Sequence, residues 1–112
     1  MAAKPRARAR ARAETDLRSL MNVGPAVEAY LSDLGVHTID ELAKQQADGL
    51  YRRLQRRIGK ACDPCLYDTF SAIIHEARTG QKRPWFTFTP ARKRRQATGE
   101  LDLGIPSRTK RQ

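Results

Sequence analysis

The sequence predicts a single all-α domain, and three observations support this. Its length of 112 residues is the usual size of one domain. Apolar side chains recur at helical spacing across residues 17–80, and glycine, proline and capping residues divide them into short segments. Alternation with a period of two is confined to residues 85–89, where flanking prolines argue against a place in a sheet.

The first two helices are predicted on either side of a tight turn. Each has one apolar stripe at helical spacing, formed by Leu17, Leu20 and Met21 in the first and by Val27, Tyr30, Leu31 and Leu34 in the second. The turn reads Asn22-Val23-Gly24-Pro25, which puts a proline at the first position of the second helix. Gly35 then supplies a left-handed residue that ends this helix.

Three further helices complete the predicted bundle of residues 14–80. Thr38 and Glu41 form a capping box, so the third helix begins at Ile39. The fourth helix ends at Gly59 and has an apolar stripe of Leu50, Leu54 and Ile58. Asp63 and Pro64 begin the fifth helix, which ends at Gly80. Its buried face is predicted to contain Leu66, Phe70, Ile73, Ile74 and Ala77.

Residues 81–97 are expected to pack on this bundle. We expect Trp85–Thr89 to be extended because Pro84 and Pro90 flank it, with its aromatic side chains folded back onto the core. Thr89 and Pro90 are expected to begin a short basic helix that continues through Ala97. Residues 1–13 are an Arg-Ala repeat and residues 98–112 are rich in glycine, proline and charge, so we predict disordered termini there.

The formal net charge of +10 is concentrated at the two ends. Residues 1–13 contain five basic and no acidic residues, residues 14–80 contain eight basic and ten acidic, and residues 81–112 contain nine basic and two acidic. Basic arms attract polyanions regardless of sequence, because binding releases counterions. The alternative is that they serve only solubility. We therefore expect DNA, or else RNA, as a partner of the arms.

The first turn is a candidate phosphate site. The pattern Leu17-x-x-Leu20-Met-Asn-Val-Gly24-Pro-x-x-x-x-x-Leu31-x-x-Leu34-Gly35-Val36 resembles a helix-hairpin-helix motif. Main-chain N–H groups at a helix N-terminus hold a phosphate without reading bases. The candidate residues are Asn22, Val23, Gly24 and Ala26. Asn22 stands where the motif has glycine but tolerates a left-handed conformation, whereas Pro25 removes one donor. The alternative is a corner that only packs.

A longer set of motifs resembles the small bacterial pathogenicity-locus proteins, also labelled mitomycin-resistance-type. It comprises Leu20–Pro25, Leu34–Thr38, Asp63–Cys65 with Asp68 and Phe70, Arg83–Phe86 and Phe88–Lys93. The first half is also similar to the C-terminal domain of the TfoX competence regulators and, more distantly, to that of the RNA polymerase alpha subunit. This resemblance implies a five-helix, SAM-like helix-hairpin-helix bundle and a bacterial source. It implies no particular activity.

The predicted fourth helix displays a basic stripe formed by Arg52, Arg53, Arg56, Arg57 and Lys60. The four arginines fall within about 140° of arc, opposite the apolar face of the helix. We interpret Arg57–Ala61 as a degenerate second turn of a paired motif, which would bring the stripe close to phosphates. The alternative is a solvated face whose charges bind nothing.

The remaining motifs argue against catalysis. Cys62 and Cys65 form a C-x-x-C, but a zinc site needs further ligands and a thioredoxin-like redox site needs a βαβ setting. The position of Cys65 at a helix start suggests a lowered thiol pKa, although packing as a small apolar group is favoured. No nucleophile–His–acid grouping, glycine-rich phosphate loop or carboxylate cluster is present. We therefore predict no enzyme, cofactor, metal or small-molecule substrate.

The sequence contains no apolar run of membrane length and no secretory signal, so we expect a cytoplasmic protein, associated with the nucleoid if it binds DNA. Non-sequence-specific DNA binding through the turn, the basic stripe and the basic ends is the favoured function. The alternative is a protein-interaction module of a bacterial regulatory or DNA-repair-related system that does not contact DNA. The near-neutral core and Pro25 favour this alternative.

Overall fold

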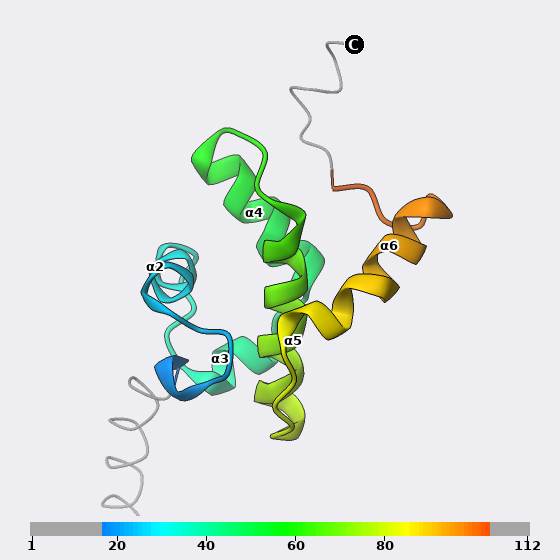
Figure 1. Cartoon of the computed structure of the whole chain (residues 1–112). Coiled ribbons are helices and arrows are strands. Elements are labelled where there is room, and N and C mark those ends of the chain that lie inside the picture. The colour runs from blue at the N-terminus through cyan, green and yellow to red at the C-terminus, as the bar shows by residue number, and fades with distance from the viewer. Residues whose placement is uncertain (1–16, 104–112) are drawn as a thin grey trace, which may run out of the picture.

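The computed structural model describes residues 17–103, which form helices, turns and one 3₁₀ segment but no strand (Figure 1). Residues 17–19 are helical and lead into the first turn. The later elements are α2 (Pro25–Asp33), α3 (Ile39–Ala43), α4 (Ala47–Ile58), α5 (Pro64–Thr79), η1 (Trp85–Phe88) and α6 (Thr89–Ala97). The predicted all-α fold class is confirmed. The predicted arm of residues 1–13 lies outside the described residues.

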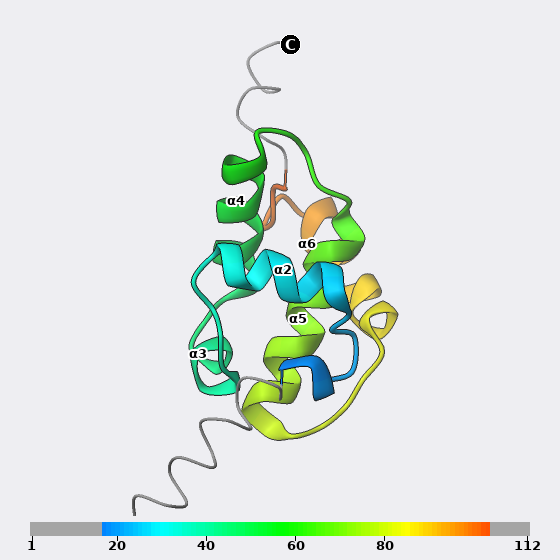
Figure 2. The ribbon, with the colours of Figure 1, turned by 90° about the vertical axis from the view of Figure 1, so that its left-hand side faces the viewer.

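Helix α5 lies at the centre, and the other elements pack around it (Figures 1 and 2). Its Phe70 and Ile73 have no exposed surface. The apolar stripes of the surrounding helices meet them in one core, as the sequence spacing predicts. The buried members from α2, α3 and α4 are Leu31, Leu42, Leu50, Tyr51 and Leu54. Two residues that the spacing places on buried stripes are instead exposed, namely Met21 in the turn and Ile58 at the end of α4. Each lies at or just beyond a helix end, where the neighbouring helices cover less of the side chain.

The predicted helix boundaries are confirmed where capping residues mark them. Thr38 accepts the N–H of Glu41 at 3.0 Å, and the Glu41 carboxylate accepts the N–H of Thr38 in return. Asp63 accepts the N–H of Cys65 at 2.9 Å and begins α5. Gly59 and Gly80 end α4 and α5 with φ angles of 84° and 80°. Residues within one turn of each helix end therefore determine where these helices begin and end.

The segment Trp85–Phe88 is a 3₁₀ helix, so the prediction of an extended strap is wrong. In a strand, Trp85 and Phe88 would point to opposite faces, whereas residues three apart in a 3₁₀ turn share a face. Both rings are half-buried, and η1 packs on α5. Phe86 points outward with 59% of its surface exposed, so it does not join the core. The predicted basic helix that follows is confirmed as α6.

Residues 98–103 are ordered and packed, whereas the sequence predicts a tail from residue 98. Leu101 and Leu103 are only 4% and 8% exposed and belong to the core. The side-chain amide of Gln55 donates to the main-chain oxygen of Leu103 at 3.2 Å. Two apolar residues separated by one position do not form a helical pattern, so the sequence does not predict that this segment packs on the core. Residues 104–112 of the predicted tail lie outside the described residues.

The Leu101→Ala variant is expected to lower the free energy of unfolding by about 2–4 kcal/mol, because it leaves a cavity in the core. Chemical denaturation followed by circular dichroism measures this loss. Met21→Ala is the matched control, because Met21 is well exposed and should lose much less stability. Equal stability of Leu101→Ala and the wild type would show that residues 98–103 do not contribute to the core.

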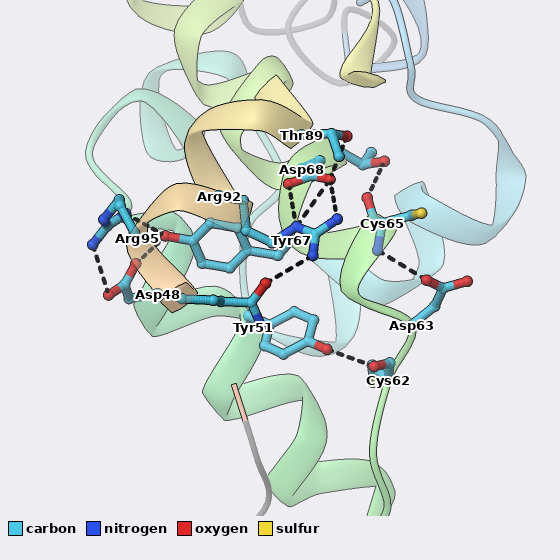
Figure 3. Close-up of polar contacts among 12 residues, drawn as sticks. Asp48, Tyr51, Cys62, Asp63, Cys65, Tyr67, Asp68, Thr89, Arg92 and Arg95 are labelled. Atoms are coloured by element: carbon cyan, nitrogen blue, oxygen red, sulfur yellow. Dashed lines mark hydrogen bonds and ion pairs between the residues drawn. The ribbon is translucent and has the colours of Figure 1, made fainter. Parts of the chain in front are cut away.

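A buried ion pair fastens α6 to α5 (Figure 3). Asp68 of α5 has no exposed surface and Arg92 of α6 is 8% exposed. The Arg92 Nε lies 2.9 Å from Asp68 Oδ1, and Arg92 Nη2 lies 3.0 Å from Asp68 Oδ2. The hydroxyl of Thr89 also donates to Asp68 at 2.8 Å. Helical periodicity places Asp68 on a polar face, but that face is covered by α6.

A second polar link joins the same two helices to α4. The hydroxyl of Tyr67 donates to the carboxylate of Asp48 and accepts an N–H from Arg95 at 3.0 Å (Figure 3). Burial, and the adjacent Asp48, raise the pKa of Tyr67 to about 12, so its hydroxyl keeps its proton at neutral pH. These links explain how the very basic helix α6, which has little apolar surface, stays in place.

Candidate nucleic-acid interface

The turn before α2 keeps several main-chain donors open. Asn22 adopts the left-handed conformation predicted for it, with φ of 79°, and it is the only non-glycine residue with positive φ in the described part of the chain. The Val23 N–H is used inside the turn, since it donates to Leu20 at 3.2 Å. Three N–H groups at the start of α2 have no acceptor among residues 17–103, namely those of Gly24, Ala26 and Val27.

Gly24 is the N-cap of α2, and no side chain caps this helix. A Cβ atom at Gly24 would meet nothing within 4 Å, so the space in front of the helix is open. The starts of α3 and α5 are capped by Thr38 and Asp63, whereas those of α4 and α6, like that of α2, have no side-chain cap. An uncapped helix start carries partial positive charge and has free N–H donors, and an anion bound there would accept hydrogen bonds from them.

The side chain of Asn22 fixes the turn to the segment that precedes η1. Its Oδ1 accepts the N–H of Trp85 at 3.1 Å, and its Nδ2 donates to the main-chain oxygen of Arg83 at 2.9 Å. The Met21 N–H donates to Glu76 of α5 at 2.9 Å. Sequence analysis missed these contacts, because nothing in a local pattern pairs residue 22 with residues more than 60 positions away.

The charged groups around the turn are largely paired. Glu28, in the first turn of α2, lies 3.1 Å from Arg18, and Glu76 lies 2.6 Å from Lys82. Neither carboxylate is therefore left as an uncompensated charge that would repel an anion. Arg83 is exposed, and its guanidinium lies over the ring of Phe88 at 5.3 Å from the centroid. Its main-chain oxygen contacts Asn22 whereas its guanidinium contacts Phe88, so Arg83 is an exposed cation on the segment that meets the turn and a further candidate that the sequence does not indicate.

The corner between α4 and α5 differs from the predicted second turn. Asp63 places a carboxylate at the start of α5, and its bond from the Cys65 N–H lowers the Asp63 pKa. Pro64 has no N–H, and the Leu66 N–H donates to the main-chain oxygen of Asp63 at 2.9 Å. A negatively charged cap occupies the place where a phosphate would bind, so residues 57–61 do not provide what a second phosphate-binding turn needs.

The basic stripe of α4 lies at the opposite end of α2 from the turn (Figure 2). Arg53 donates to the main-chain oxygen of Leu34, just after α2, at 2.6 Å, and Arg52 lies 3.4 Å from the oxygen of Asp102. The other three stripe residues are exposed, and their side chains make no hydrogen bond within residues 17–103; they are Arg56, Arg57 and Lys60. Since α2 is about 13 Å long by its rise per residue, the turn and the stripe do not form one contiguous site.

Comparisons with known proteins agree with the motifs. The family described as Cdd1, pathogenicity locus, matches residues 10–94, well over half of the chain. The chain belongs to this family. It is also 38% identical to the mitomycin resistance protein McrB of Streptomyces lavendulae, over 71% of this chain and 76% of that protein. These findings confirm the pathogenicity-locus resemblance, while the similarity to TfoX stays a prediction.

A second relative shares a shorter segment with this pathogenicity-locus chain. The DNA polymerase IV of Moorella thermoacetica is 37% identical over 54% of the chain, and the match covers 18% of the polymerase. No solved structure matches the chain significantly. In this family member, the motifs that carry the resemblance meet in space, because Asn22 contacts Arg83 and Trp85 while Asp68 contacts Thr89 and Arg92.

A groove of about 430 Å³ runs between the end of α4, the start of α5 and η1. Its walls are mainly apolar, with Tyr30, Ile58, Leu66 and Trp85 among the residues that line it. Both cysteines also line this groove. Among residues 17–103, no three His, Cys, Asp or Glu side chains gather closely enough to hold a metal ion, and no helix is long and apolar enough to cross a membrane.

The suggestion of a lowered Cys65 pKa is wrong. Burial raises the pKa of both cysteine thiols, and the neighbouring Asp63 raises that of Cys65 further. Burial is the main cause of this raised pKa, and the carboxylate at the helix start adds to it. Because the thiolate is the reactive form, iodoacetamide should alkylate both cysteines slowly at neutral pH and faster as the pH rises above the ordinary thiol pKa. Mass spectrometry follows the reaction, with the urea-unfolded chain as the reference; equal rates in the folded and unfolded chains would contradict the raised pKa.

Proposed function

We propose that this protein binds nucleic acid without sequence preference, with DNA as the principal partner. The turn from Asn22 to Ala26 acts as a helix-hairpin-helix corner that holds a backbone phosphate. The observation that supports this proposal is the group of open N–H donors at the start of α2, in front of a glycine that leaves the approach free. Because these donors are main-chain groups, they contact phosphate and read no base.

Other cations of the chain extend this contact. Arg83 borders the turn, and the exposed residues Arg56, Arg57 and Lys60 lie beyond the far end of α2. A nucleic acid that follows α2 from one end to the other reaches both groups. The basic residues of 1–13 and 104–112 add sequence-independent attraction. One relative of the chain is a DNA polymerase, and a DNA-binding role for the shared segment agrees with that name. A cytoplasmic location at the nucleoid follows from this proposal.

An amide NMR titration with duplex DNA tests the proposal. We expect shifts to concentrate at residues 22–27, with smaller changes at 52–60 and at Arg83. The logarithm of affinity should fall linearly with the logarithm of salt concentration, with a slope of about −0.9 per phosphate neutralised. Unrelated duplexes should bind with similar affinity. Shifts restricted to residues 1–16 and 104–112 would assign the binding to the arms and contradict a role for the turn.

A protein-interaction role is the second candidate, and the apolar groove between α4, α5 and η1 favours it. Ile58 is exposed at the edge of this groove. An Ile58→Gln variant, which adds no charge beside Arg57 and Lys60, should then weaken a partner interaction that resists nuclease treatment and leave DNA affinity unchanged. Loss of the partner on nuclease treatment of the wild type would instead favour an indirect contact through nucleic acid.

A further inference from the structure

The 3₁₀ segment η1 presents an aromatic ring to solvent beside the phosphate corner. Trp85 and Phe88 face α5, while Phe86 lies on the outer side with 59% of its surface exposed. The rings of Trp85 and Phe86 meet edge to face, with centroids 5.8 Å apart and planes at 81°. The half-buried indole therefore supports the outward ring and restricts its movement. A rigid exposed aromatic face is what a nucleic-acid base stacks on.

The same residue positions both the ring and the phosphate donors. The main-chain conformation of Asn22 turns the chain into α2, and its side-chain bonds to Arg83 and Trp85 hold the start of η1 against that turn. Figure 2 shows the turn and η1 side by side at one edge of the molecule, away from α4. Phe86 thus lies on the segment that contacts the turn, one residue after Trp85, whose N–H is bonded to Asn22.

The charges around η1 suit a polyanion. Arg83 precedes η1, and Lys93 and Arg94 are exposed on α6, which follows it directly. None of these three cations has an acidic partner among residues 17–103. Lys82, by contrast, is engaged by Glu76. The segment that carries the exposed ring is therefore flanked in sequence by these cations and contacts the turn that has the open main-chain donors, a combination that suits a phosphate and its attached base together.

We infer that the surface formed by the Asn22–Val27 turn, Arg83 and Phe86 binds single-stranded nucleic acid, with one phosphate on the open N–H groups and a neighbouring base stacked on Phe86. Bases of an intact duplex are stacked on one another and cannot reach this ring, so the geometry favours unpaired strands. This inference rests on the proposed function and specifies its ligand. It also accounts for the outward position of Phe86, which packing in the core does not explain.

Comparison of single-stranded and duplex ligands with the full chain tests the inference. The probes are fluorescently labelled homopolymers of thymidine and of uridine, each about 16 nucleotides long to span one binding site, and a DNA duplex of the same length. Anisotropy gives the affinities. Trp85 is the only tryptophan of the chain and supports Phe86, so its emission reports stacking. We expect single strands to bind more tightly than the duplex and to quench Trp85, with the two homopolymers separating DNA from RNA.

Variants of Phe86 separate stacking from simple apolar contact. Phe86→Ala should weaken single-strand binding about tenfold, the typical loss of one stacked base, and leave duplex binding unchanged. Phe86→Leu should lose nearly as much, because it keeps apolar bulk without a π face, whereas Phe86→Trp should restore binding. The ring is exposed, so all three variants should fold, which thermal unfolding verifies. Gln46→Ala, at the exposed and uncharged residue that precedes α4, is the control and should bind single strands as the wild type does.

The outcomes distinguish this inference from the function on which it rests. Salt-dependent binding that prefers the duplex, or that is unaffected by Phe86→Ala, would overturn the inference and leave the proposed function intact. Equal losses of single-strand and duplex affinity in Phe86→Ala would also overturn it, because a general contact would then explain the ring. Absence of salt-dependent binding to any probe would overturn both. A nuclease-resistant protein partner lost in Phe86→Ala, with single-strand binding unchanged, would assign the ring to a protein interface.

Discussion

Asp68→Ala is expected to lower the free energy of unfolding by about 3–5 kcal/mol, because it leaves the Arg92 guanidinium buried without a counter-ion. A loss of this size removes much of the roughly 5–15 kcal/mol that stabilises a domain. The variant should also release α6, since Thr89 and Arg92 both bond to Asp68. Urea denaturation measures the loss, and hydrogen exchange should show reduced protection across residues 89–97.

Two further variants separate the buried charge from ordinary ion pairing. Glu100→Ala removes the carboxylate that lies 3.3 Å from Arg95 in an exposed pair, and it should cost less than about 1 kcal/mol. Asp68→Leu combined with Arg92→Met replaces the buried pair by apolar groups of similar size, and it should recover most of the stability that Asp68→Ala loses. A small effect of Asp68→Ala, comparable with that of Glu100→Ala, would show that α6 is held by other contacts.

The helices predicted correctly are those whose ends are determined by residues close in sequence. The capping box of Thr38, the Asp63-Pro64 start and the glycines at 59 and 80 act within one helical turn, so the sequence alone indicates them. The apolar stripes of α2, α4 and α5 then follow from spacing. The family is likewise evident from the sequence, because its motifs can be matched directly. In the structure, these motifs include the residues that form long-range contacts.

The errors concern features that depend on distant partners. Trp85–Phe88 forms a 3₁₀ turn because two of its rings pack on α5, and Leu101 and Leu103 enter the core because α4 and α5 leave space for them. Asp68 appears polar in a helical projection and is buried because Arg92 reaches it from a later helix. In each case the decisive neighbour lies more than ten residues away, and a local pattern contains no information about it.

The candidate site likewise combines local features, which the sequence predicts, with long-range contacts, which it does not. The left-handed Asn22 and the uncapped helix start are local properties, and the sequence predicts both. The contacts of Asn22 with Arg83 and Trp85, and the bond from Arg53 to the far end of α2, depend on how the helices cross. The sequence-based prediction combined the turn with the basic stripe of α4 in one site. In the structure the main chain of Arg83 and Trp85 meets the turn, and the stripe lies at the other end of α2.

Substitutions at Gly24 should separate phosphate binding from folding. Gly24 has φ of −104° and ψ of −171°, which any residue adopts, and its missing Cβ faces open space. An aspartate there should cap α2 by accepting the N–H groups of Ala26 or Val27 and should change stability by only a few tenths of a kcal/mol. The same carboxylate occupies the proposed phosphate position with a negative charge. Gly24→Asp is therefore expected to reduce nucleic-acid affinity at least tenfold, about 1.4 kcal/mol, at low salt.

A graded series at this position identifies the cause. Gly24→Ala leaves the N–H donors open and should bind within about threefold of the wild type. Gly24→Asn caps the same donors without charge and should fall between alanine and aspartate. Fluorescence anisotropy across a salt series measures each affinity, and the difference between asparagine and aspartate should shrink as salt screens the added charge. Equal binding by the alanine, asparagine and aspartate variants would mean that the donors at the start of α2 do not contact phosphate. A loss already complete in the alanine variant would instead indicate that the glycine is needed for close approach of the sugar-phosphate chain.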